Sequence, residues 1–244
     1  MKKGKIIIAN WKMNFLLKDS YIFVKKIILK KKLFKNKLIL CPPSSIIFAI
    51  SKLLNKKIPL GAQNCHYDKF GPYTGELSPL MLKDIGCSYV VIGHSERREF
   101  HYEDNQLIKK KINNASKNNL NVIFCIGENF DLRKKGKTLT FLSKQLEESL
   151  PKNIKNKKIF IAYEPIWSIG SGLVPKISEI VKIHRFIKEK IVKINTNYKN
   201  VKIFYGGSVD KKNAKELLKI NEVDGLLLGG SSLEINKLLS ILCI

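Results

Sequence analysis

Eight short runs of apolar, often β-branched residues recur along the chain. Within each run the apolar residues are nearly continuous and do not alternate with polar ones. Continuous apolar runs of this length are typical of parallel strands that are buried on both faces of the sheet. The runs occupy residues 6–9, 38–41, 58–62, 89–92, 122–126, 159–163, 201–205 and 225–228.

Longer segments with helical spacing lie between these runs. Leu17, Tyr21, Val24 and Ile28 are spaced by three or four residues, and five isoleucines between positions 180 and 194 show the same spacing. Residues 211–218 and the segment after Pro79 show the same helical spacing of apolar residues. Alternation of strands and helices predicts parallel strands joined by right-handed crossovers. Eight such units predict an α/β fold, a single (β/α)8 barrel domain over residues 1–244.

A doubly wound open sheet is the main alternative to the barrel. Such a sheet commonly carries a Gly-x-Gly-x-x-Gly motif after its first strand, and the chain has none there. No break in composition and no linker divides the chain into two parts. Both observations favour the closed barrel.

The net charge of the chain is strongly positive. It contains 45 Lys+Arg against 20 Asp+Glu, a formal charge of +25, and only four of the basic residues are arginine. A charge of this size points to nucleic-acid or anionic-membrane binding. Proteins that grip nucleic-acid phosphates favour the planar guanidinium group, however, and the lysines here are spread along the whole chain. We therefore expect solvated lysines, no specific nucleic acid, no membrane partner, and attraction of a small anionic substrate.

The cysteine content indicates a reducing compartment. The five cysteines are odd in number and include no Cys-x-x-Cys pair, which argues against a disulfide framework and against a zinc site. The first apolar run is too short for a signal peptide, and no run approaches the ~20 residues of a membrane span. We expect a cytoplasmic protein with no metal and no cofactor.

Polar residues follow the predicted strands at the points where the strands end. Asn10 and Lys12 follow the first strand, His94 follows the fourth, and Glu164 follows the sixth. In a barrel the carboxyl ends of all strands meet at one rim, and barrel enzymes carry out their chemistry there. A lysine, a histidine and a glutamate on one rim can serve as charge stabiliser, acid and base.

Each of these residues taken alone also has a structural explanation. Lys12 is one of 41 lysines, His94 fits a core histidine, and Glu164 fits a loop carboxylate before a proline. Their joint placement at one end of one barrel is what indicates a functional site. The remaining histidines lie in predicted loops or helices away from the strand ends and are expected to be structural: His66, His101 and His184.

Two glycine-rich turns after the last two predicted strands add a phosphate site. Ser208 and the backbone amides of Gly229 and Gly230 precede predicted helices. Backbone N–H groups at the start of a helix bind phosphate, and barrels often hold phosphate after strands seven and eight. These turns support a phosphorylated substrate.

Together these features resemble the triosephosphate isomerase family along essentially the whole chain. The family interconverts dihydroxyacetone phosphate and D-glyceraldehyde 3-phosphate, a step of glycolysis and gluconeogenesis, without cofactor or metal. The matching motifs, in chain order, are Asn10-Trp11-Lys12-Met13-Asn14, Gly75-Glu76, Gly93-His94-Ser95-Glu96-Arg97-Arg98, Cys125-Ile126-Gly127-Glu128, Tyr163-Glu164-Pro165-Ile166-Trp167, Ile169-Gly170-Ser171-Gly172, Tyr205-Gly206-Gly207-Ser208-Val209 and Gly229-Gly230.

The resemblance implies a role for each site residue. Glu164 is the base that moves a proton between neighbouring carbons, and His94 is a neutral electrophile on the substrate oxygens. Asn10 and Lys12 anchor the substrate and stabilise the enediolate oxygen, and Glu96 holds Lys12 in place. The residues implied to grip the phosphate are Gly170, Ser208, Gly229 and Gly230.

The resemblance also implies a mobile lid and a homodimer. The lid is residues 165–176, whose closure excludes water from the enediolate. The segment from Cys65 to Pro79 is implied to dock into a second subunit, with Thr74 near the partner's active site. The second lid hinge departs from the family pattern: it reads Leu173-Val174-Pro175, and we expect Ser178 to cap the helix that follows.

A different class of function is the alternative. The chain could be a basic nucleic-acid-binding protein on a barrel that no longer catalyses, which predicts strongly salt-dependent binding to DNA or RNA. A complete set of Lys12, His94 and Glu164 argues against lost catalysis.

Overall fold

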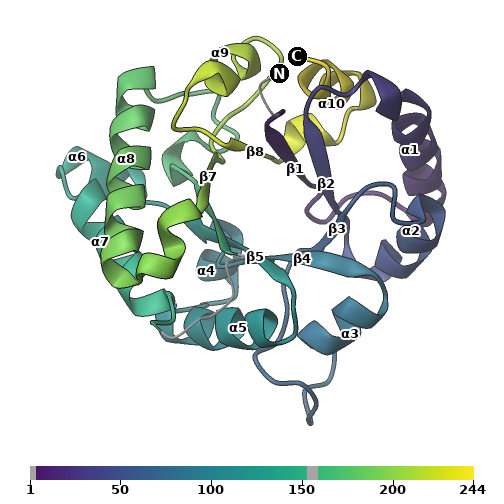
Figure 1. Cartoon of the computed structure of the whole chain (residues 1–244), viewed down its shortest axis with the longest axis horizontal. Helices are drawn as coiled ribbons and strands as arrows, with labels where there is room; N and C mark the ends of the chain where they lie inside the picture. The colour runs from purple at the N-terminus through teal and green to yellow at the C-terminus, as the bar shows by residue number, and fades with distance from the viewer. Residues whose placement is uncertain (1–3, 153–158) are drawn as a thin grey trace.

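The computed structural model describes residues 4–152 and 159–244, and they form a closed parallel barrel surrounded by helices (Figure 1). Each strand pairs in parallel with the next, and β1 also pairs with β8, which closes the sheet. The predicted (β/α)8 barrel is confirmed. The strands are β1 Ile6–Asn10, β2 Lys37–Cys41, β3 Leu60–Ala62, β4 Cys87–Ile92, β5 Asn121–Ile126, β6 Ile159–Tyr163, β7 Lys202–Tyr205 and β8 Gly225–Leu228.

The helices form a ring outside the barrel (Figure 1). They are α1 Leu17–Lys30, α2 Ile47–Leu54, α3 Pro79–Asp84, α4 Ser95–Phe100, α5 Asn105–Lys117, α6 Phe130–Lys134, α7 Thr138–Ser149, α8 Ile177–Ile194, α9 Ala214–Lys219 and α10 Ile235–Leu242. Short 3-10 turns supplement them at Lys31–Leu33, Ser44–Ile46, Ile166–Ser168, Thr196–Asn200 and Gly230–Ser232.

The strands are apolar throughout because both of their faces are buried. Alternate residues such as Ile6 and Ile8 point into the barrel, where they pack with Ile39, Ile123 and Phe204. The intervening residues pack against the helices in a larger outer core that includes Ile7 and Ala9. A strand buried on both sides needs apolar side chains at every position, which explains the nearly continuous runs in the sequence.

The starts of strand β3 and helix α9 differ from the sequence-based prediction for reasons that the local residues explain. Strand β3 begins at Leu60 and not at residue 58, directly after Pro59, which has no N–H group to offer a neighbouring strand. Helix α9 begins at Ala214 and not at residue 211, because the Asp210 side chain accepts the N–H groups of Lys212 and Asn213 and forms a separate turn.

The expected helix cap at Ser178 is wrong. Helix α8 begins at Ile177 with Lys176 in the capping position. The Glu179 carboxylate accepts the Lys176 N–H at 3.0 Å, and this contact turns the chain into the helix two residues earlier than expected.

The described residues contain no helix that is long and apolar enough to cross a membrane. The five cysteines are all free, and four of them are buried. Within residues 4–152 and 159–244, no group of three or more His, Cys, Asp or Glu side chains is arranged to hold a metal ion.

His184 is a fully buried histidine of helix α8, as expected for a structural residue. Its Nδ1 lies 3.0 Å from the Glu222 carbonyl oxygen, and its ring meets the Tyr163 ring edge-on. Its Nε2 is buried and finds no hydrogen-bond partner within the described part of the chain. Burial lowers the pKa of His184 from 6.5 to about 4, so the folded protein keeps this ring neutral.

We predict that His184 makes folding stability sensitive to mild acid. Between about pH 6.5 and pH 4 the unfolded chain binds a proton on this ring that the folded protein does not, so stability falls as the pH falls. At pH 5 the loss is about 2 kcal/mol. Urea unfolding of the wild type and of His184→Gln at pH 7 and pH 5 measures it. The wild type should lose that much more than the variant, and equal losses would contradict the assignment.

Candidate active site

The structure gathers the sequence-predicted residues around one cavity at the carboxyl ends of the strands. The cavity has a volume of about 490 Å³ and receives residues from strands, turns and the lid. Glu96 is outside this lining but contacts Lys12, which is part of it. The predicted residues that line the cavity are Asn10, Lys12, His94, Glu164, Gly170, Ser208, Gly229 and Gly230.

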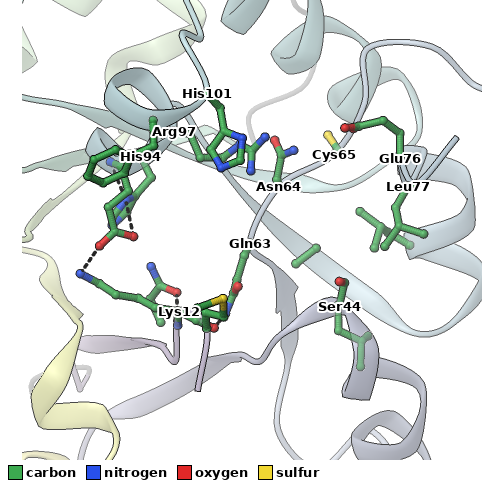
Figure 2. Close-up of a pocket in the computed structure, with 18 residues that line it drawn as sticks. Lys12, Ser44, Gln63, Asn64, Cys65, Glu76, Leu77, His94, Arg97 and His101 are labelled. Carbon is green, nitrogen blue, oxygen red and sulfur yellow. Dashed lines mark hydrogen bonds and ion pairs between the residues drawn. The ribbon is translucent and has the colours of Figure 1, made fainter. Parts of the chain in front are cut away.

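Lys12 is held in an unusual backbone conformation. Its φ of 52° lies in the left-handed region, which costs energy for a residue with a side chain. Two contacts stabilise this turn: the Lys12 N–H donates to Asn10 Oδ1 at 3.0 Å, and Gln63 Nε2 donates to the Lys12 carbonyl oxygen at 2.8 Å. The ammonium group then reaches Glu96 Oε1 at 2.6 Å, as the dashed line in Figure 2 shows. The strained turn therefore aims the Lys12 charge into the mouth of the barrel.

His94 stands at the start of helix α4, where its ring has two different neighbours. Nδ1 accepts the backbone N–H of Glu96 at 3.3 Å, so this nitrogen carries no proton in that arrangement. Nε2 lies 3.1 Å from Glu164 Oε1. This geometry points Nε2 of His94 toward the cavity and the Glu164 carboxylate.

Glu164 directly follows strand β6, and its side chain is almost fully buried at 2% exposure. Its Oε2 accepts the backbone N–H of Ser95 at 3.2 Å while Oε1 faces His94. Two glycines make room for it. A Cβ added at Gly127 would lie 1.7 Å from the Glu164 carbonyl oxygen, and one at Gly206 would lie 3.0 Å from Glu164 Cγ.

The two glycine-rich turns lie side by side but do not lead directly into helices as expected. Helix α9 begins at Ala214, well after Ser208, and the 3-10 turn Gly230–Ser232 separates Gly229 from helix α10. The Ser231 hydroxyl donates to the Val209 carbonyl oxygen at 2.5 Å and links the turns. Amides at turns of this kind still bind anions, because neighbouring N–H groups point into one concave surface.

The segment predicted to form a lid, residues 165–176, is anchored where it leaves the barrel. Trp167 Nε1 donates to Glu128 Oε1 at 3.0 Å, and the Tyr163 hydroxyl donates to the same oxygen at 3.1 Å. Burial raises the pKa of Glu128. The Arg133 guanidinium lies over the Trp167 ring, 4.1 Å from its centre. Glu128 thus ties the start of the predicted lid to the end of strand β5.

Sequence reasoning assigned no role to three residues that position the site. Gln63 and Glu128 both follow predicted strands, so the strand-end criterion that selected His94 and Glu164 applies to them equally. Ser95 acts through its backbone N–H, which no residue pattern reveals.

A second cavity has a volume of about 450 Å³. Figure 2 shows the side chains that line it. Lys12, His94 and Asn10 line both cavities, and Gly75 and Glu76 of the segment between β3 and α3 close one side of the second. His101, expected to be structural, lies on its wall (Figure 2). Large apolar side chains near it are exposed to solvent, with Met13 at 94% and Phe100 at 67%.

Charge is distributed unevenly between the rim and the rest of the molecule. The rim segments run from the end of each strand to the helix that leads to the next strand: residues 11–16, 42–46, 63–78, 93–104, 127–137, 164–176, 206–213 and 229–234. They contain eleven Lys or Arg and eleven Asp or Glu. The whole excess of +25 therefore lies on other parts of the chain, and at physiological salt charges farther than ~8 Å are largely screened. The net charge of the chain is therefore expected to attract an anionic substrate only weakly at the rim where the cavity opens.

Comparisons with known proteins agree with this geometry. The family model described as Triosephosphate isomerase matches residues 5–244. The chain is 44% identical to the triosephosphate isomerase of Dictyoglomus turgidum over 239 residues, covering 95% of this chain and 96% of that one. It is 42% identical to that of Thermodesulfovibrio yellowstonii, with 94% and 95% covered. The crystal structure of the Bartonella henselae enzyme superposes with a TM-score of 0.87 at 36% identity, covering 97% of each chain.

We predict that Gly127→Ala destabilises the fold by about 3 kcal/mol or more. The added Cβ would collide with a backbone oxygen, which cannot rotate away as a flexible side chain could. Gly230→Ala is the matched control, because nothing lies within 4 Å of its added Cβ, and its free energy of unfolding should change by less than about 0.5 kcal/mol. Urea unfolding of both variants checks this, and equal effects would contradict it.

Proposed function

Because this chain belongs to the triosephosphate isomerase family, we propose that it interconverts dihydroxyacetone phosphate and D-glyceraldehyde 3-phosphate through an enediolate formed at Glu164, His94 and Lys12. The observation that carries the proposal is the shared cavity: these three side chains and the two glycine-rich turns line the same space. The reaction moves one proton between neighbouring carbons, and we infer that it needs neither metal nor cofactor.

Glu164 is the proposed base. In the first half of the reaction its carboxylate takes a proton from the hydroxymethyl carbon of dihydroxyacetone phosphate, and the electron pair moves onto the carbonyl oxygen. In the second half it returns the proton to the neighbouring carbon. Both carboxylate oxygens are engaged here, one by the Ser95 N–H and one near His94 Nε2. Glu164 must release at least one of them before it reaches the substrate.

His94, Lys12 and Asn10 are proposed to stabilise the enediolate. A neutral His94 ring donates its Nε2 proton to the substrate oxygens, which supports proton exchange between them. The Lys12 ammonium places a positive charge where the oxyanion forms, usually the largest contribution to catalysis. Asn10 supports the Lys12 turn and contributes to substrate binding, and Glu96 holds the ammonium at 2.6 Å.

The phosphate is proposed to lie against the amides of Ser208, Gly229 and Gly230, with Gly170 approaching from the lid. All four residues line the same cavity as Glu164. Gly170 is exposed and has a φ of 68°, which suits a flexible lid tip. Closure of the lid over the phosphate would exclude water and protect the enediolate.

A second copy of this chain is the proposed partner. The segment from Cys65 to Pro79 projects away from the barrel (Figure 1), and Thr74 within it is exposed. The cavity beside Lys12 and its exposed neighbours Met13 and Phe100 offer a partly apolar receptor for this segment from the partner. Thr74 of the partner subunit would then lie next to Lys12.

The nucleic-acid alternative receives no comparable support. The rim offers nucleic acid no excess of positive charge, and the residues predicted for isomerase catalysis line one cavity there together. Free, mostly buried cysteines suit the cytoplasmic location that we propose.

We predict that Glu164→Asp lowers kcat about a hundredfold with KM little changed. The shorter side chain withdraws the base by roughly 1 Å, and a misplacement of this size costs about 10²-fold. Glu164→Gln keeps the shape but cannot accept the proton, and should lose about 10³-fold or more. A coupled assay of glyceraldehyde 3-phosphate formation measures both. A folded Glu164→Gln with near wild-type kcat would remove Glu164 as the base.

We predict that the protein sediments as a dimer at micromolar concentration and that Thr74→Trp splits it. A large side chain at this exposed position of the docking segment would not fit the cavity beside Lys12 in the partner, so activity should fall together with the dimer. Thr196→Trp is the matched control, since Thr196 is also exposed but lies in the turn before β7 at the opposite end of the barrel. A fully active wild-type monomer would contradict the proposed partner.

A further inference from the structure

The Ser168 side chain joins the lid to the phosphate site. Ser168 ends the 3-10 turn at the first lid hinge and is fully buried. Its hydroxyl donates to the Leu173 carbonyl oxygen at 2.5 Å and accepts the Ser208 N–H at 3.2 Å. The Tyr205 hydroxyl lies 3.4 Å away. One buried oxygen thus contacts both ends of the lid and the turn after strand β7.

The contact with Ser208 uses an N–H group that the proposed function assigns to the phosphate. An N–H group has one proton and cannot make two full hydrogen bonds at once. The turn that carries Ser208 is also packed closely against this hydroxyl, because a Cβ added at Gly207 would lie 2.9 Å from Ser168 Oγ. The phosphate and the lid therefore compete for the same donor.

The contact with Leu173 joins the two sides of the lid tip to each other. Between Ser168 and Leu173 the chain turns through Gly170 and Gly172, which both have positive φ. The Ser171 hydroxyl accepts the Leu173 N–H at 3.1 Å and lies 3.1 Å from both the Trp167 and the Ser168 carbonyl oxygens, which share its single proton. Ser171 bonds only within the lid, whereas Ser168 also bonds to the barrel.

We propose that Ser168 is a positioning residue that couples the lid to the phosphate by competing for the Ser208 N–H. The proposal rests on the phosphate position given under the proposed function. A phosphate oxygen is charged and forms a stronger hydrogen bond than a hydroxyl, so arriving phosphate displaces Ser168 from Ser208. The released hydroxyl keeps its bond to Leu173 and has Tyr205 within reach, so it does not become an unpartnered buried group. When phosphate replaces Ser168 as the partner of the Ser208 N–H, this change affects both lid hinges, because Ser168 lies in the first hinge and its hydroxyl is bonded to Leu173 in the second.

The proposal has a measurable consequence for phosphate affinity. Part of the binding free energy of the phosphate is used to break the Ser168–Ser208 hydrogen bond, so the observed affinity is lower than that of a free site. Removing the hydroxyl should strengthen phosphate binding about fivefold, the effect of one ordinary hydrogen bond. A residue that only supported the fold would weaken binding when removed, or leave it unchanged.

Inorganic phosphate is the probe for this test, in the full-length protein. Its inhibition constant is measured in wild type, in Ser168→Ala and in the matched control Ser171→Ala, which alters a bond inside the lid only. Trp167 precedes Ser168 and is one of only two tryptophans, so its fluorescence follows the lid hinge in the same titrations. We expect about fivefold tighter binding and a smaller fluorescence change per bound phosphate in Ser168→Ala, with Ser171→Ala like wild type.

Each other outcome overturns a definite part of the argument. Equal or weaker phosphate binding in Ser168→Ala, with competitive inhibition of the wild type intact, overturns the coupling role and leaves the proposed function standing. Failure of phosphate to compete with substrate in the wild type overturns the phosphate site and the coupling with it. Should the alanine variant fold poorly, Ser168→Cys keeps most of the volume with a weaker hydrogen bond, and it should shift affinity in the same direction by a smaller factor.

Discussion

Closure of the parallel sheet between β1 and β8 is the constraint on which the rest of the molecule depends. Eight parallel strands closed into a ring must present all of their carboxyl ends on one rim. Residues far apart in sequence, such as Lys12, His94 and Glu164, then share one cavity without any long loop. The same closure buries both faces of every strand, which leaves the rim as the place where polar side chains can gather.

The site is held by hydrogen bonds that the reaction has to exchange. Glu164 is bonded to the Ser95 N–H, Lys12 to Glu96, and the Ser208 N–H to Ser168. Each bond keeps a buried or partly buried polar group satisfied before substrate arrives. At these three groups, substrate binding therefore replaces existing contacts. The cost of this exchange is small when the incoming group is a charged phosphate or a developing oxyanion.

The net positive charge of the chain lies away from the rim that carries the site. The rim segments balance eleven basic residues with eleven acidic ones, although the chain as a whole carries +25. Carboxylates at the rim have partners with specific geometry, such as Glu96 with Lys12 and Glu103 with Arg97 at 2.5 Å. The excess lysines lie on other parts of the chain, and the local field at the site is set by its own residues.

The sequence by itself determined the strand and helix order, the closed barrel and the residues at the strand ends, because these follow from short-range periodicity and from where each apolar run stops. The boundary errors at Pro59, Asp210 and Lys176 are local too, since each arises from a side-chain or proline effect within a few residues. Only the tertiary structure decided that Gln63 supports Lys12, that Ser95 binds Glu164 and that Ser168 binds Ser208. Those contacts join loops from different strands, and their distances depend on strand register and loop path, which no local pattern of residues encodes.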